Sequence, residues 1–92
     1  MKSMGEEALL RALIRCRRFS KRNGEAELEE NGRLVIYRDG RPVGSWSYTD
    51  EQRFHFTPLG CARPTATNSI EVARHITLKQ LDKHKAEHFA DV

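Results

Sequence analysis

The fold is decided by the stretch NGRLVIYRDGRPVGSWSY, which runs from residue 31 to residue 48. It contains Asn31-Gly32 and Asp39-Gly40, the favoured two-residue hairpin turns, because both central positions of such a turn need a positive φ. The turns separate strands expected at about 25–30, 33–38 and 41–48, and a fourth short strand is expected at about 53–57. The sequence therefore predicts a three- to four-stranded antiparallel meander over residues 25–57.

The turns also predict which face of this sheet is buried. Two-residue turns place Glu30 opposite Arg33 and Arg38 opposite Arg41. One face then carries an apolar and aromatic set, which we assign to the core: Ala26, Leu28, Val35, Tyr37, Gly44, Trp46 and Tyr48. The other face is mixed, and its exposed apolar members would form an interface patch: Leu34, Ile36 and Val43.

The N-terminal segment, residues 1–23, predicts one basic helix. Ser3 and Glu6 form a capping box at its start, and Asn23-Gly24 is a stop signal at its end, since glycine adopts the left-handed conformation without steric cost. Between these signals, Leu9, Leu13 and Cys16 share one face. We expect a continuous helix of about 19 residues.

Residues 58–68, which include Pro58, Gly60 and Pro64, are expected to form a loop. Asn68 or Ser69 then caps a C-terminal helical region over 69–90. Val72 and Ile76 point away from the face of the other apolar residues, and Thr77 begins a second capping box. These signals predict helices at about 69–75 and 78–89 with a break near Thr77, and a strand over 70–76 is the alternative.

Composition favours a single α+β domain spanning residues 1–92. The chain is 38% hydrophobic and 32% charged, has a net charge of +3, and contains two cysteines, which we interpret as free thiols. It has no apolar run of membrane-spanning length and no secretory signal pattern, so the cytoplasm is the expected location. The charge is compatible with an acidic partner or nucleic acid and requires neither.

The clearest candidate for function is an arginine stripe on the first helix. Arg11, Arg15, Arg18 and Arg22 would occupy an arc of about 60° opposite the apolar face, and Arg17 and Lys21 extend it. Arginine binds phosphate and carboxylate groups with paired donors, whereas a merely solvated face could equally use lysine. A second candidate is the basic hairpin tip with Arg38 and Arg41, together with Arg33 at the preceding turn.

Other chemistry is not expected from the sequence. The chain has no GxSxG, P-loop, GxGxxG, HExxH or CxxC motif, so we expect neither an enzyme nor a cofactor. His84 and His88 have a spacing that can chelate a metal, but Cys16 and Cys61 are far apart in sequence and we expect no metal site. The aromatic residues of the sheet could stack on bases, but a domain of this size needs them in its core.

One stretch resembles a known type of protein. Residues 33–46, then Arg53-Phe54-His55-Phe56, then residues 68–76, are similar to small hairpin-plus-helix proteins of phages and mobile elements. The resemblance covers residues 33–76 and carries over no functional residue. It implies a protein that blocks or modifies host nucleic-acid machinery, such as an anti-defence inhibitor.

These observations predict a small non-enzymatic protein that docks on a larger protein or nucleoprotein complex with an acidic or phosphate-bearing surface. The alternative is direct binding of DNA or RNA through the arginine helix and the basic hairpin. The residues expected to contact the partner are Arg11, Arg15, Arg17, Arg18, Lys21, Arg22, Arg33, Arg38 and Arg41.

Overall fold

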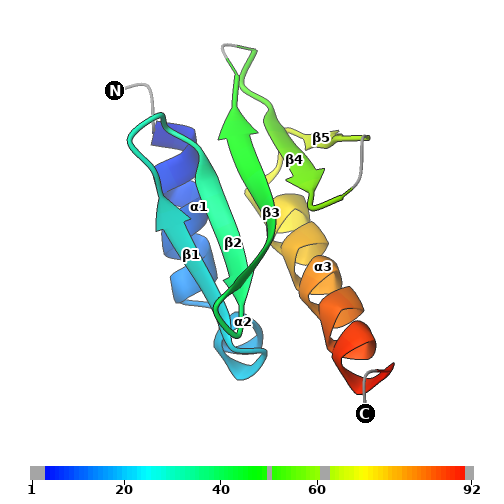
Figure 1. Ribbon diagram of the computed structural model, residues 1–92. Helices are drawn as coiled ribbons and strands as arrows, with labels where there is room; N and C mark the ends of the chain where they lie inside the picture. Colours follow the sequence, from blue (N-terminus) through cyan, green and yellow to red (C-terminus); the bar gives the residue numbers. More distant parts are fainter. Residues whose placement is uncertain (1–3, 50, 61–62, 91–92) are drawn as a thin grey trace.

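The computed structural model describes residues 4–49, 51–60 and 63–90, with side chains for residues 5–49, 51–60 and 63–83. It has an α+β fold in the order α1 (Met4–Ile14), α2 (Arg17–Lys21), β1 (Gly24–Leu28), β2 (Leu34–Arg38), β3 (Arg41–Tyr48), β4 (Phe54–Pro58), β5 (Thr65–Thr67) and α3 (Ile70–Ala90). The strands form one antiparallel meander in sequence order (Figure 1). The predicted fold class is confirmed, with five strands, because β5 lies within the expected loop at 58–68.

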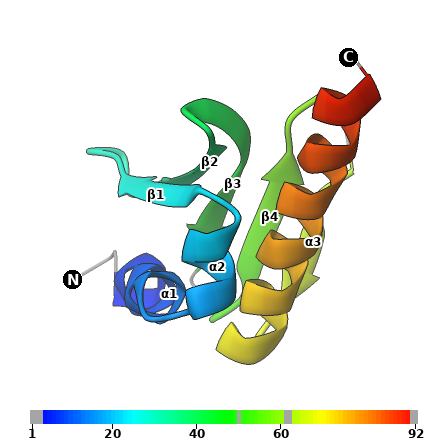
Figure 2. The same ribbon diagram turned by 90° about the horizontal axis from the view of Figure 1, so that it is seen from below.

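The helices pack on one face of the sheet, and no helix of the described residues lies on the other face (Figure 2). Leu9 and Leu13 of α1, Phe19 of α2 and Leu81 of α3 belong to a single core with Trp46 and the other inward side chains of the sheet. We call the opposite side of the sheet the helix-free face. The fold therefore has two layers, one of helices and one of sheet, because an amphipathic sheet must bury its apolar face.

The predicted register at the first hairpin is wrong by one residue. Glu29 rather than Glu30 faces Arg33: the Glu29 amide donates to the Arg33 carbonyl at 2.8 Å, and Gly32 closes a three-residue turn with φ +88°. A bulge at Val43 then shifts the pairing of β2 with β3, although Arg38 does face Arg41 as predicted. Because side chains alternate along a strand, these shifts exchange the two faces of β2.

The exchange reverses part of the predicted core. Leu34, Ile36 and Val43, which the sequence placed in an exposed patch, are completely buried. Val35 and Tyr37, expected in the core, lie half-buried on the helix-free face. The proposed apolar interface patch does not exist.

The expected single N-terminal helix is also wrong. The chain leaves helical geometry at Cys16, which is extended at φ −86° and ψ 116°, before α2 begins. Phe19 explains the break: a continuous helix would hold it at the edge of the apolar face, whereas the break turns it into the core, where it is 3% exposed. Cys16 is a free thiol that packs half-buried against the core, and Ser3 and Cys61 lie outside the described residues.

The C-terminal helix α3 is continuous through Thr77, so neither the predicted break nor the alternative strand over 70–76 occurs. Its buried face follows Ala73, Thr77, Gln80 and Leu81, and two polar residues on that face concealed it in the sequence. The Thr77 hydroxyl accepts a hydrogen bond from Trp46 Nε1 at 2.9 Å and donates to the Ala73 carbonyl at 2.8 Å. The predicted cap at Ser69 is confirmed by its hydroxyl, which accepts from the Val72 amide.

Gly44 marks a close contact between β3 and β4. A Cβ atom at this position would lie 2.4 Å from Cζ of Phe56 and 3.0 Å from the Thr57 carbonyl oxygen. We therefore expect Gly44→Ala to lower the free energy of unfolding by about 1–3 kcal/mol, as overpacking of a tight core does. Urea unfolding measures this, with Ser45→Ala on the helix-free face as control, and equal stability of the two variants would contradict the packing described.

Candidate binding surface

A group of exposed basic side chains runs from the end of α1 through α2. We call this group the basic surface: Arg11, Arg15, Arg17, Arg18 and Lys21. None of these five side chains forms an ion pair or a hydrogen bond with any residue whose side chain the structure describes. Adjacent like charges destabilise a helix slightly, so the folded domain gains nothing evident from their presence. The five side chains are free to meet an external acidic group.

The break at Cys16 means that these residues do not form the single stripe expected from a continuous helix. Arg11 belongs to the last turn of α1, Arg15 to the connecting turn, and the others to α2 (Figure 1). The predicted arc of about 60° therefore does not apply, because it assumed one continuous helix.

Arg22 has a structural role. Its Nε donates to Asp82 Oδ1 at 2.7 Å and its Nη2 donates to Oδ2 at 3.3 Å, so the guanidinium binds the carboxylate in a bidentate manner. A third donor, Nη1, reaches the Arg18 carbonyl at 2.9 Å. The hydrogen bond to Asp82 raises the pKa of Arg22 above its usual value, and burial opposes this shift. The ion pair of Arg22 with Asp82 therefore links the C-terminal end of α2 to α3.

The predicted hairpin residues separate in the structure. Arg38 donates from Nη1 to the Leu81 carbonyl at 3.2 Å and its side chain is only 11% exposed, so it mainly holds the sheet to α3. Arg41 is exposed beside the Asp39-Gly40 turn, which is tied to the α2–β1 turn by Asn23 Nδ2 donating to Asp39 Oδ1 at 2.8 Å. Arg33 is exposed at the opposite end of β2 and does not share a surface with Arg41.

Two basic residues that were not predicted as site residues lie close to the ion pair of Arg22 with Asp82. Lys79 and Lys83 are exposed on α3, at three residues before and one residue after Asp82. The ion pair of Asp82 with Arg22 brings this part of α3 to the end of α2. The expected break near Thr77 hid this relation, because the orientation of a helix beyond a break cannot be inferred from spacing.

The aromatic residues of the sheet are core, as expected. Trp46, Phe54 and Phe56 are at most 3% exposed, and the ring of Trp46 packs against both phenylalanines at centroid distances of 6.1 and 4.8 Å. Tyr37 is the exception, since it lies on the helix-free face and its hydroxyl donates to Glu27 at 3.4 Å. The buried rings offer no platform on which bases could stack.

The described residues contain no group of three or more histidine, cysteine, aspartate or glutamate side chains that could hold a metal ion. The side chains of His84 and His88 lie outside the described part. Within the portion of the chain that the structure describes, no helix combines the length and the apolar character needed to cross a bilayer.

Comparison of the chain with models of protein families, with curated proteins and with solved structures gives no match.

Proposed function

We propose that the protein is a non-enzymatic binding module that docks on a larger protein or nucleoprotein complex through its basic surface. The observation that carries the proposal is the set of five exposed cations on α1, α2 and the turn between them, without ion-pair partners among the described side chains. A surface of this kind complements acidic patches and accelerates association with them.

The rest of the domain supports a scaffold role. Arg22 and Arg38 hold α2, α3 and the sheet together, so the exposed cations sit on elements fixed by hydrogen bonds. A rigid support lowers the entropy that binding must overcome. The resemblance to small phage and mobile-element proteins suggests that the target belongs to host nucleic-acid machinery and that the protein acts there as an anti-defence inhibitor in the cytoplasm.

The second candidate function is direct binding of DNA or RNA, because arginine forks also fit phosphates. The basic surface and Arg41 favour it. Glu25, Glu27, Glu29 and Glu30 oppose it, since all four are exposed and would repel a phosphate backbone that followed the sheet. Salt separates the two functions: phosphate-dominated binding falls steeply between low and moderate salt, whereas a protein interface with apolar anchors persists.

Charge reversal at the basic surface tests the proposal. We expect Arg15→Glu combined with Arg18→Glu to weaken partner capture from a lysate of the source cells at least about tenfold, because each change replaces an attraction with a repulsion. The matched control is Arg33→Glu with Arg53→Glu, which changes the net charge equally using two exposed arginines elsewhere. Both double variants should unfold at the urea concentration of the original protein. Equal loss of capture in both would remove the basic surface from the proposal.

A further inference from the structure

The strand β1 lies at one edge of the sheet, and no described strand pairs with its outer side. It is five residues long, whereas the opposite edge strand, β5, has three. Short edge strands are one means by which proteins avoid pairing with other chains, so β1 is the edge more open to pairing.

The backbone groups available on this edge follow from the register. Glu29 pairs with Arg33 through a ladder hydrogen bond, and the Asp39 amide donates to the Asn23 carbonyl at 3.2 Å. Hydrogen-bonded positions alternate in an antiparallel pair, so Glu25 and Glu27 direct their amide and carbonyl groups to β2. Gly24, Ala26 and Leu28 direct theirs away from the sheet.

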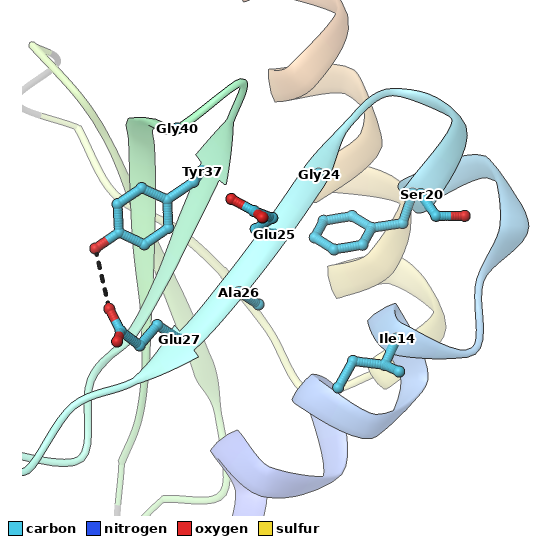
Figure 3. A pocket seen from close by; sticks show the side chains of 9 residues that line it. Ile14, Ser20, Gly24, Glu25, Ala26, Glu27, Tyr37 and Gly40 are labelled. Carbon is cyan, nitrogen blue, oxygen red and sulfur yellow. Dashed lines mark hydrogen bonds between the residues drawn. The ribbon is translucent and has the colours of Figure 1, made fainter.

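On the helix-free face, the edge is flanked by negative charge. Glu25 and Glu27 are exposed there, beside Tyr37 (Figure 3). Glu29, also exposed, follows directly after the strand. Neither Glu25 nor Glu27 forms an ion pair with a described side chain. Burial, together with the charges of Glu27 and Glu29, raises the pKa of the Tyr37 hydroxyl.

On the helix side, the same edge is flanked by apolar surface. Ile14, at the end of α1, is 66% exposed and lies below β1 (Figure 3). The side chain of Phe19 lines the same part of the surface. These two residues line one side of a groove of about 630 Å³, which also includes Gly24, Ala26, Glu25, Glu27 and Tyr37 and therefore reaches across the edge to the helix-free face. An isolated apolar side chain on a surface needs no explanation. Ile14, however, adjoins a strand edge with which no described strand pairs.

We propose that the outer edge of β1 receives an extended segment of a partner protein whose residues alternate between basic and apolar. The segment adds a strand through the backbone groups of Gly24, Ala26 and Leu28, as in β-strand addition. Its basic side chains lie on the helix-free face against Glu25 and Glu27, and its apolar side chains lie on the helix side against Ile14. This site uses side chains other than those of the basic surface and selects the opposite charge.

A second copy of the chain fits this edge poorly. Two β1 strands paired antiparallel about Ala26 would place Glu25 of each copy opposite Glu27 of the other. Like charges directly opposite each other destabilise a strand pair. Charge complementarity therefore favours a basic segment over self-association.

The proposal can be tested with a capped peptide that alternates lysine and valine and is as long as β1. Titration followed by amide NMR should shift the Gly24, Ala26 and Leu28 signals and slow their hydrogen exchange. Glu25→Lys with Glu27→Lys should weaken binding of this peptide at least about tenfold, since it reverses the charge complementarity. The same peptide with glutamate in place of lysine serves as the charge control and should not bind the original protein.

The strand-addition geometry has its own test in the backbone. Ala26→Pro removes an amide donor that points away from β2, a position at which proline is tolerated in an edge strand, and should abolish binding. If this variant does not fold, N-methylated peptides replace it. Methylation of the peptide amides that would face β1 should abolish binding, and methylation of the intervening amides should not. Equal binding of both methylated peptides, no binding of the lysine–valine peptide, or dimerisation through β1 in its place would overturn the proposal.

Discussion

Replacement of Trp46 by alanine is expected to lower the free energy of unfolding by about 3–5 kcal/mol. Trp46 is completely buried between Phe54, Phe56 and α3, and its indole nitrogen donates to Thr77 at 2.9 Å. Truncation would leave a cavity at the centre of the only core that the described residues form and remove one of the hydrogen bonds that join β3 to α3. Since small domains have about 5–15 kcal/mol of stability in total, much of the population should unfold in mild denaturant.

Urea unfolding followed by circular dichroism measures this effect. Trp46→Phe keeps most of the aromatic packing and loses only the hydrogen bond and part of the ring, so its stability should fall between those of the original protein and Trp46→Ala. Ser47→Ala, at an exposed position next in the same strand, should change stability by no more than about 0.5 kcal/mol. A Trp46→Ala protein that is fully stable but no longer binds its partner would assign the indole to a binding platform instead.

Replacement of Ile36 by lysine should destabilise the domain by more than about 4 kcal/mol, because it places an unpaired charge in the core. Ile36 is completely buried and faces Gly44 in β3 and Ala26 in β1. Val35→Lys, one residue earlier, puts the same side chain on the helix-free face near Glu27 and should change stability by about 1 kcal/mol or less.

This pair of variants tests the register of the sheet by the same measurement. The two-residue turn at Asn31-Gly32 would have produced the opposite order, with Val35 buried and Ile36 exposed. A stable Ile36→Lys protein with an unfolded Val35→Lys protein would therefore contradict the three-residue turn and the bulge at Val43.

The order and type of the elements could be predicted because the turn and cap signals are local. Asp39-Gly40 sets a hairpin with Arg38 opposite Arg41, and the Ser69 hydroxyl caps α3. The register could not be predicted, because a glycine after asparagine closes both two- and three-residue turns and a bulge leaves no composition signal. The continuity of α3 was hidden because its buried face contains the polar residues Thr77 and Gln80. Both are satisfied there by hydrogen bonds to β3: Thr77 accepts from Trp46, and Gln80 donates to the Val43 carbonyl.

The candidate surface was predicted in part. Charge composition is enough to identify the basic segment from Arg11 to Lys21, and the structure keeps its side chains exposed. Spacing alone could not show that Arg22 and Arg38 are structural rather than exposed, because their partners Asp82 and Leu81 lie more than 40 residues away in sequence. A strand at about 25–30 was predicted, but its outer edge was not recognised as a site, because the glutamates there disfavour a strand.

The most direct test of the proposed function is capture of partners by the tagged protein from lysate of its source cells, with and without nuclease, beside the Arg15→Glu, Arg18→Glu variant. The account predicts a defined set of proteins that survives nuclease and disappears with the double variant. Capture that disappears entirely after nuclease would contradict docking on a protein surface and would assign the basic surface to phosphate. An unchanged set of proteins on the double variant would contradict the role of the basic surface itself.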